Sequence, residues 1–355
     1  MNVHAAALAQ AYQFDEQTSA FAGDVIGDLS QFPKRLSPKY FYDAAGSELF
    51  EQITILPEYY PTRTELGILR SRGDEIAALI PKGAALVEFG AGATTKVRLL
   101  LERCDFGAYV PVDISGDFLS AQASALRKDF PELGVYPVAA DFTAPFALPA
   151  EIEGMPKVGF FPGSTLGNFE PQEALAFLRS ARDILGEGAQ MIIGVDLEKN
   201  ERVLYDAYND AAGVTARFNL NVLIRINREL GGNFDVSAFM HRSIYNRERH
   251  RIEMHLIAKK AQTVRILGRN FSFRPGESIH TESRATNTAS TASPHWRATP
   301  AGRSANPGPT MTGCFPFTRW WRQTEEWARA LQLTSLRFTS CRPISGGPVA
   351  AGVLE

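Results

Sequence analysis

Hydrophobic residues in this chain form short runs that alternate with longer segments of helical spacing. The segments between the runs, such as 116–130, place apolar residues three and four apart, which predicts helices with one buried face. Strands alternating with helices predict an α/β fold with a doubly wound, Rossmann-like parallel sheet. The runs that predict the strands are 84–89, 108–112, 135–140, 157–161 and 191–197.

The alternation stops after residue 197. Residues 199–230 have helical spacing, and 234–245 and 251–258 read as two strands joined by a polar turn, a hairpin. Val264–Ile266 and Phe271–Phe273 predict a further short pair of strands. We therefore expect two domains, a Rossmann-like domain and an α+β substrate-binding domain that roofs it. The expected divisions are 62–197 plus 283–355 for the first, and 1–61 plus 198–282 for the second.

Residues 283–313 differ from the rest of the chain. They are rich in Ser, Thr, Ala, Pro, Asn and Gly and contain no Asp, Glu or Lys. Such a segment cannot bury enough apolar surface to offset its ordering entropy. The Trp-rich residues 315–340 predict a helical piece, and Leu336–Thr339 predicts a weak strand.

Charge, cysteine content and the lack of long apolar runs give expectations about binding partners and compartment. The chain has 355 residues and a net charge of −2, which gives no electrostatic reason to expect nucleic acid. Its three cysteines, Cys104, Cys314 and Cys341, have no metal-ligand spacing and indicate a reducing cytoplasm. No signal peptide and no apolar run long enough for a bilayer is visible, so we expect a cytoplasmic protein without membrane association. We also expect a monomer, and the cysteine spacing gives no reason to expect a metal.

A glycine-rich turn follows the first predicted strand. Gly90 and Gly92 come directly after 84–89, and a helical pattern opens at Thr94, a layout that places a ligand at the carboxyl end of a strand. Glu88, at the strand end, can accept hydrogen bonds from that ligand. A dinucleotide site would need a third glycine where Thr95 stands, and the loop lacks the Gly-Lys-Ser/Thr of a phosphate-binding loop. The turn alone is equally compatible with a plain strand-to-helix connection.

Acidic residues also end the next two predicted strands. Asp113 follows 108–112 at the separation of one βαβ unit, which places a carboxylate near a ribose diol. Asp113 could instead cap the following helix, for which Ser115 competes. Asp141 and Phe142 follow 135–140 and suit an adenine, with the carboxylate on the amino group and ring beside ring. The alternative for this pair is an exposed turn.

Several longer stretches resemble the histidine-specific methyltransferases, which make hercynine in ergothioneine biosynthesis. The resemblance covers about residues 35–282 in consistent order. The matching stretches include Phe-Tyr-Asp-Ala-Ala-Gly-Ser-Glu-Leu-Phe and Leu-Pro-Glu-Tyr-Tyr-Pro-Thr-Arg-Thr-Glu within 41–65, Pro-Gly-Ser-Thr-Leu-Gly-Asn-Phe at 162–169, Ala-Tyr-Asn-Asp-Ala-Ala-Gly-Val-Thr-Ala-Arg-Phe-Asn-Leu-Asn-Val-Leu at 207–223 and Ile-His-Thr-Glu at 279–282.

The resemblance implies transfer of methyl groups from S-adenosylmethionine to the α-amino nitrogen of L-histidine, in three rounds. By position, the implied cofactor contacts are Gly90, Lys96, Asp113, Asp141 and Phe142. The implied catalytic residues are Asn168 and Tyr42. The implied substrate pocket is formed by Tyr42 near the amine, Tyr59 and Tyr208 on the carboxylate side, Gly163, Asn168 near both groups, and Glu282 as the acceptor of the imidazole.

Each of these positions also has an ordinary structural interpretation. Asn168 could be a helix N-cap after Gly167. Glu282 could be a solvated acid at a strand end, and Lys96 an exposed lysine in the first turn of a helix. A tyrosine in an aromatic segment could equally be a core residue with its hydroxyl at the surface.

The chain departs from the family after Glu282. The family has a serine two residues after this glutamate, whereas here Arg284 stands at that place and Ser283 comes one position early. We hypothesise that the chain beyond Glu282 is out of register with its relatives, as a change of reading frame would cause. Coding DNA in which no alternative frame restores the family's closing strands would refute this hypothesis.

Three other functions remain open from the sequence. The first is methylation of another amine, such as a tryptophan derivative, which methyl-transfer assays with several amino acids would separate. The second is a non-catalytic S-adenosylmethionine-binding protein, indicated by binding without turnover. The third is an NAD-dependent oxidoreductase, which the absent third glycine argues against and a nicotinamide-binding titration would test.

Overall fold

A parallel sheet of seven strands forms the larger half of the computed structural model, which describes residues 16–197, 199–285 and 333–338. The strand order is β13-β7-β6-β2-β3-β4, with β5 also paired to β3, and every pairing is parallel. The order changes direction at β2, because the chain adds β3 on one side and β6 on the other. This is the switch point where α/β sheets bind ligands. The strands are β2 (Ala84–Phe89), β3 (Phe106–Asp113), β4 (Gly134–Val135), β5 (Val138–Ala139), β6 (Lys157–Phe161), β7 (Gln190–Asp196) and β13 (Leu333–Phe338).

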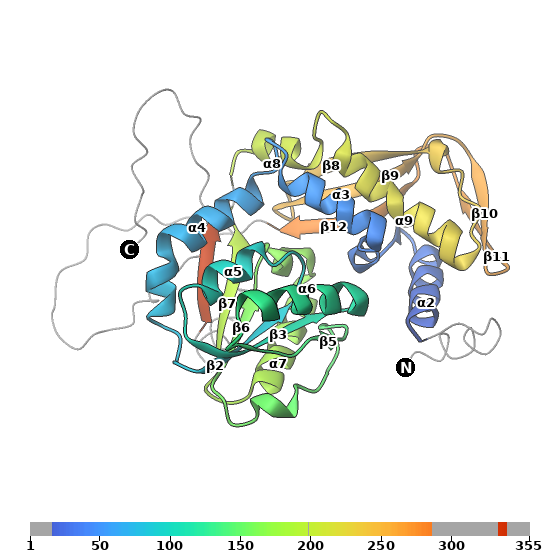
Figure 1. Ribbon diagram of the computed structural model, residues 1–355. Helices are drawn as coiled ribbons and strands as arrows, with labels where there is room; N and C mark the ends of the chain where they lie inside the picture. The colour runs from blue at the N-terminus through green and yellow to red at the C-terminus, as the bar shows by residue number, and fades with distance from the viewer. Residues whose placement is uncertain (1–15, 198, 286–332, 339–355) are drawn as a thin grey trace.

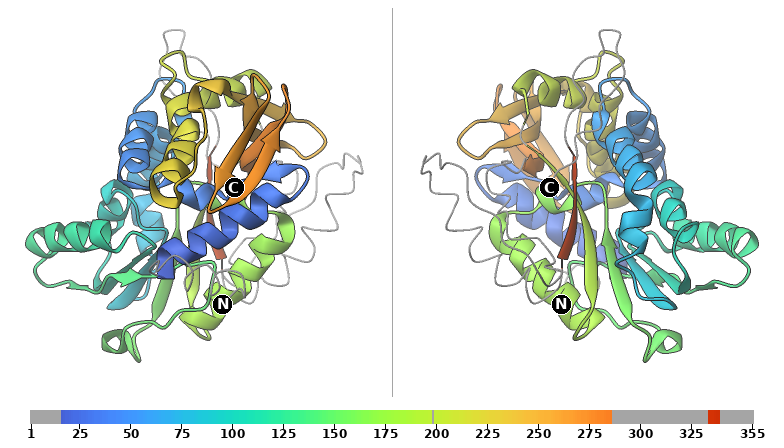
Figure 2. Two further views of the ribbon diagram at one scale, coloured as in Figure 1. Left: turned by 90° about the vertical axis from the view of Figure 1, so that its right-hand side faces the viewer. Right: turned by 90° about the vertical axis from the view of Figure 1, so that its left-hand side faces the viewer.

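Helices cover both faces of this sheet (Figures 1 and 2). The residues of β2 alternate between the two faces: Leu86 packs with Leu69 and Leu100, and Val87 packs with Phe177. The helices α4 (Tyr60–Ala77), α5 (Thr95–Leu101) and α6 (Gly116–Asp129) therefore lie on one face, and α7 (Pro171–Leu185) lies on the other. The predicted Rossmann-like fold is confirmed.

A second sheet lies over the carboxyl ends of the first (Figure 1). Its order is β1-β12-β9-β8, with β1 parallel to β12 and the other pairs antiparallel. Its strands are β1 (Lys34–Arg35), β8 (Phe239–Asn246), β9 (Arg251–Ala258) and β12 (Ser278–Ala285). A separate hairpin is formed by β10 (Gln262–Ile266) and β11 (Arg269–Phe273), as the sequence predicted.

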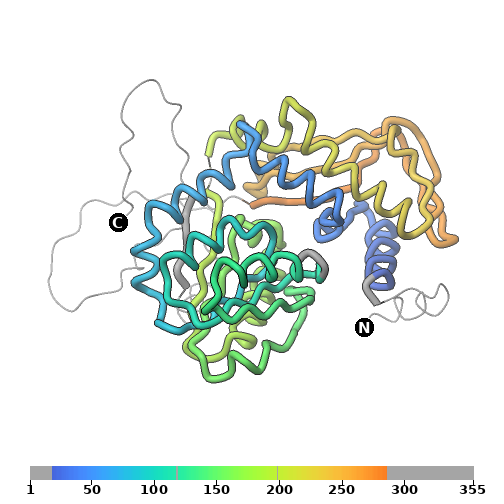
Figure 3. Tube along the Cα trace, viewed as in Figure 1, coloured from blue at the N-terminus to red at the C-terminus, as the bar shows by residue number. Residues whose placement is uncertain are grey.

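Segments far apart in the sequence build the core beside this second sheet. Figure 3 shows the amino-terminal segment beside the chain after residue 200. One apolar cluster joins Phe41 near the amino terminus to Phe218 and Leu256, and the Phe41 and Phe218 rings lie 4.7 Å apart. The helices contributing to this half are α2 (Glu16–Ser30), η1 (Pro38–Phe41), α3 (Ala44–Thr54), α8 (Glu201–Tyr208), α9 (Val214–Leu230) and η4 (Val236–Ala238).

The structure corrects several predicted boundaries. The single helix expected over 199–230 is two helices, because the Asp210 carboxylate accepts the backbone N–H groups of Val214 and Thr215, both at 2.8 Å, and so starts α9. The strand expected at 135–140 is the two short strands β4 and β5. The division into two domains stays a prediction, and its expected limits after residues 61 and 282 lie within α4 and β12.

Parts of the carboxyl-terminal expectations lie outside the described residues. These are the Trp-rich helical piece and all of 283–313 except the last residues of β12. The weak strand expected at Leu336–Thr339 is present as β13, which starts earlier and pairs with β7. Among the helices that the structure describes, none combines the length and apolar character needed to span a bilayer.

Candidate active site

A cavity of about 1030 Å³ lies between the two sheets, at the carboxyl ends of β2 and β3. The parallel sheet contributes Gly90 and Asp113 to its lining, and the second sheet contributes Glu282. Asn168 enters from η3 (Thr165–Asn168), the turn that follows β6, and Tyr42 enters from the loop after η1. Residues that the sequence assigned to cofactor and substrate therefore line one cavity.

The glycine turn presents backbone to this cavity. Gly90 has φ +74°, and a Cβ there would lie 3.2 Å from the Phe142 ring. The N–H groups of Gly90 and Ala91 both donate to the carbonyl of Val112, at 2.8 and 3.0 Å, which ties the turn to β3. At Gly92 a Cβ would meet nothing within 4 Å, because this residue faces the open cavity. The turn thus has the open cradle that close backbone approach of a ligand requires.

Glu88 is a buried carboxyl group at the bottom of the cavity. The Tyr109 hydroxyl donates to its Oε2 at 2.6 Å. Burial raises the pKa of Glu88 from 4.5 to about 7, and the hydrogen bond from Tyr109 and the charge of Lys96 only partly oppose this rise. Near neutral pH the group can therefore donate or accept a hydrogen bond.

The two acidic strand ends differ in the groups that bond to each carboxylate. Asp113 accepts the Ser115 N–H at 2.9 Å through Oδ1 and also accepts hydrogen bonds from the Ser115 hydroxyl and the Ile114 N–H, and burial raises its pKa. Asp141 accepts both the N–H and the hydroxyl of Thr143 through Oδ1, and Lys39 Nζ lies 3.3 Å from its Oδ2. Burial opposes ionisation of Asp141, but these bonds keep its pKa low. Both carboxylates border the cavity, and Asp141 differs from Asp113 in its pairing with a lysine.

Lys96 does not stand free in the cavity, because it is paired with a residue that the sequence analysis missed. Its Nζ lies 2.6 Å from Oε2 of Glu65, whose side chain is fully buried. The Glu65 carboxylate also accepts the N–H of Gly163 at 2.9 and 3.0 Å. The available signal was an acid on the apolar face of a helix, since Glu65 shares the buried face of α4 with Leu69 and Ile76.

Four of the expected substrate residues border the cavity directly, namely Tyr42, Gly163, Asn168 and Glu282. The Oδ1 atom of Asn168 is buried and has no hydrogen-bond partner among the described residues. Burial raises the pKa of Glu282, and the charge of Arg284 and the Asn168 side chain oppose this rise. Burial and the charge of Glu282 raise the pKa of Tyr42, so its hydroxyl stays protonated. The site thus offers an amide oxygen, a carboxylate and a phenol donor at the cavity wall.

Tyr59 and Tyr208 lie behind this wall. They line a separate space of about 10 Å³, bordered also by Glu282 and Arg284. Their rings meet edge to face at 6.0 Å, and the Tyr208 hydroxyl has no hydrogen-bond partner among the described residues. The structure therefore places these two tyrosines next to the expected substrate residues but not on the large cavity itself.

Arg284 lies at the boundary of the two spaces, which Phe50 and Glu282 also border. It is 5% exposed and contributes to the lining of both. Its Nη1 donates to the Gly163 carbonyl at 2.5 Å, and its Nη2 lies 3.5 Å from Glu282 Oε1. The sequence marked this arginine as a departure from the family, but its inward orientation became visible only in the fold.

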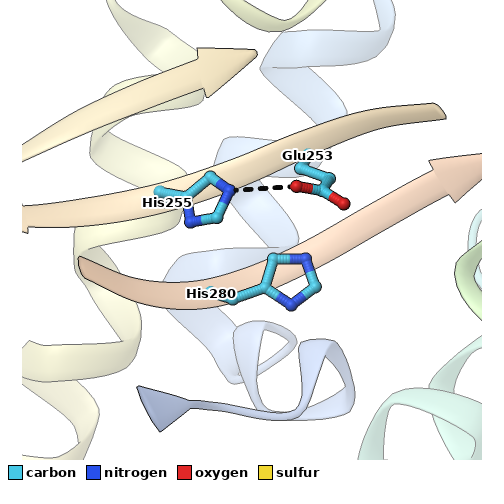
Figure 4. A group of neighbouring side chains, drawn as sticks. All are labelled: Glu253, His255 and His280. Carbon is cyan, nitrogen blue, oxygen red and sulfur yellow. Dashed lines mark hydrogen bonds and ion pairs between the residues drawn. The ribbon is translucent and has the colours of Figure 1, made fainter. Parts of the chain in front are cut away.

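A group of possible metal ligands lies at the edge of the cavity, in the second sheet. Glu253 and His255 come from β9 and His280 from β12, as Figure 4 shows. Glu253 Oε1 accepts from Arg251 Nε at 2.7 Å, and His280 Nε2 is bonded to Ser283 Oγ at 2.9 Å. Burial and the neighbouring His255 lower the pKa of His280 to about 4. Because the Arg251 guanidinium already donates to Glu253, we interpret these three side chains as part of a hydrogen-bond network.

The parallel sheet, the open glycine turn and the acidic strand end beside it define a Rossmann-like methyltransferase. Residues 21–298 match the family described as histidine-specific, SAM-dependent methyltransferase, so the match extends past Glu282. The chain belongs to this family, whose co-substrate is S-adenosylmethionine.

Relatives with curated names support the same family. The chain is 42% identical to a histidine N-alpha-methyltransferase of Mycolicibacterium smegmatis over 286 residues, 78% of this chain and 87% of the relative. It is also 42% identical to a histidine N-alpha-methyltransferase of Mycobacterium tuberculosis over 270 residues, covering 74% and 83%. It is 36% identical to an ergothioneine biosynthesis protein 1 of Neurospora crassa over 208 residues, covering 56% of this chain and 23% of the relative.

Proposed function

We propose that this protein transfers methyl groups from S-adenosylmethionine to the α-amino nitrogen of L-histidine, with three rounds giving hercynine. The observation that carries this proposal is the shared cavity: Asn168, Glu282 and Tyr42 border the same space as the glycine turn and Asp113. Membership of the histidine-specific family supports the choice of substrate.

S-adenosylmethionine supplies an electrophilic methyl group on a positively charged sulfur. The Gly90–Gly92 backbone, Asp113 and Phe142 would hold it, since the turn leaves open space and both side chains border the cavity. Lys96 would act through Glu65 and Gly163 rather than by direct contact, because its ammonium is already paired. Glu88 would accept or donate at the base of the cavity.

The substrate residues would act by positioning and by selecting the protonation state. Asn168 Oδ1, which has no partner in the part of the chain that the structure describes, can accept an N–H from the substrate amine and so fix the direction of its lone pair. The amine must be neutral to attack, and a buried site that also holds a sulfonium disfavours a second positive charge. Glu282 can accept the imidazole N–H, which an apolar side chain could not offer. None of these steps requires a metal ion or a covalent intermediate.

The test combines binding with turnover. Histidine is titrated calorimetrically into the protein saturated with S-adenosylhomocysteine, and turnover with S-adenosylmethionine is followed by mass analysis for gains of one to three methyl groups. We expect trimethylated histidine, and no methyl transfer when tryptophan replaces histidine in the same assay. Methylation of tryptophan but not of histidine would establish the alternative substrate class, and binding without any methyl transfer would establish a non-catalytic role.

A further inference from the structure

Arg284 lies among the polar groups that the proposed function assigns to the substrate. It stands two residues after Glu282 on β12, and alternate residues of a strand share one face. Gly167, in the turn after β6, packs directly on the end of this strand, since a Cβ there would lie 2.9 Å from the Ala285 carbonyl oxygen. This close packing holds the guanidinium against the Gly163–Asn168 turn.

The guanidinium leaves no room for a side chain beyond it. The space on the side of Tyr59 and Tyr208 is about 10 Å³, whereas the cavity on the other side is about 1030 Å³. A volume of 10 Å³ holds roughly one water molecule. An imidazole therefore cannot reach the two tyrosines while Arg284 keeps this position.

The contacts of Arg284 are incomplete for a buried charge. Its Nη2 to Glu282 distance of 3.5 Å exceeds that of a good charge-assisted hydrogen bond, and its buried Nε has no hydrogen-bond partner among the described residues. Asn168 Oδ1 and the Tyr208 hydroxyl, both close to this group, are also unpartnered there. A residue that stabilised the fold would be expected to satisfy these atoms.

We propose that Arg284 is a specificity-determining residue that occupies the amino-acid subsite and weakens the binding of histidine. This inference rests on the proposed function. The guanidinium donates to the Gly163 carbonyl and lies beside the Glu282 carboxylate, the acceptor that the proposed function assigns to the histidine imidazole. Histidine must displace it to bind, and the fixed positive charge also repels the substrate ammonium group.

The test compares histidine affinity, measured calorimetrically with S-adenosylhomocysteine bound, in wild type and R284S. Serine frees both acceptors and joins the two spaces, so we expect the dissociation constant for histidine to fall roughly tenfold or more. R70S is the matched control, since Arg70 is an exposed residue of α4, and its affinity for histidine should equal that of wild type. An S-adenosylhomocysteine affinity equal to that of wild type shows that a variant is folded.

Equal or weaker histidine affinity in folded R284S overturns the inference. If R284S does not fold, histidine affinity is measured in R284Q instead, because glutamine keeps most of the side-chain volume and removes the charge. Tighter histidine binding by R284Q supports the inference, and unchanged or weaker binding overturns it. Methyl transfer, measured in the same samples, tests the proposed function separately: tighter binding in R284S without any methylated histidine refutes that function and leaves the role of Arg284 standing.

Discussion

The Lys96 ammonium lies 2.6 Å from the carboxylate of Glu65, and the Glu65 side chain is fully buried. The same carboxylate accepts the N–H of Gly163. One group on α4 therefore fixes both the helix that follows the glycine turn and the turn that follows β6. Because the first borders the expected cofactor side and the second carries Asn168, this carboxylate sets the spacing of the two halves of the site.

Replacement of Glu65 by alanine should destabilise the protein strongly. The change leaves the Lys96 ammonium largely buried without its carboxylate and Gly163 without its acceptor, which costs about 3–5 kcal/mol of unfolding free energy. Urea denaturation measures this loss. Glu75→Ala is the control on the same helix, where the side chain is 68% exposed and its pair with Arg72 contributes at most about 1 kcal/mol. Equal stability of the two variants would contradict the structural role of Glu65.

Substitutions at the two glycines of the turn should have different effects, one on stability and the other on ligand affinity. Gly90→Ala places a side chain at φ +74° and against Phe142, so we expect a loss of about 1–2 kcal/mol in unfolding free energy. Gly92→Ala should leave stability nearly unchanged, because its Cβ would lie within 4 Å of no atom of the described residues. It should weaken S-adenosylhomocysteine binding roughly tenfold by filling the ligand space.

Gly67→Ala serves as the control for these two changes. Gly67 lies within α4, and a Cβ there meets nothing within 4 Å, so alanine should raise stability by about 0.5–1 kcal/mol. Calorimetry gives the binding constants, and denaturation gives the stabilities. Unaltered S-adenosylhomocysteine affinity in Gly92→Ala would remove this turn from the cofactor site.

The parallel sheet and its ligand edge could be predicted from the sequence because their signals are local. A buried strand is a short apolar run, and its carboxyl end is the residue at which the run stops, so the chain order alone predicts Glu88 and Asp113 at the ligand edge. The break between α8 and α9 was missed because it depends on Asp210 turning back onto the next helix, which apolar spacing does not record.

The interactions that bring the site together could not be predicted, since they join segments distant in the chain. From the sequence, Lys96 could be an exposed lysine, and its pairing with Glu65 is visible only once the fold places α4 beside it. Arg284 could be recognised as a departure from the family, but whether it faced solvent or the cavity depended on the register of β12, which includes an irregularity between His280 and Glu282. A shift of one residue in a strand reverses the face of every side chain.

Replacement of Asn168 by alanine should abolish turnover without loss of cofactor binding. Its amide oxygen, an acceptor without a partner among the described residues, lies at the proposed amine position, and misplacing the amine should lower kcat by about 100-fold or more. S-adenosylhomocysteine affinity should remain at the wild-type value. Turnover with and without the Asn168→Ala change is compared in the wild-type chain and again in R284S, so that weak histidine binding cannot mask the effect. Retained turnover in both backgrounds would remove Asn168 from the mechanism.

Glu88 should make stability depend on pH near neutrality. Its pKa is raised from 4.5 to about 7, so between these values the folded protein holds a proton that the unfolded chain has released. The associated stabilisation is fully present below pH 4.5 and is lost as the pH rises through 7, a change on the order of 3 kcal/mol. Glu88→Gln lacks this titration while its amide oxygen can still accept from Tyr109.

Wild type should therefore lose stability relative to Glu88→Gln when the pH is raised from about 5 to about 8, a range that spans the raised pKa. Urea denaturation without ligand at both values measures this difference, and replacement of the exposed Glu187 by glutamine is the matched control. A difference between wild type and Glu88→Gln that stays constant with pH would show that the buried carboxyl does not titrate in this range. Glu88 would then be ionised at neutral pH and could only accept hydrogen bonds from a ligand.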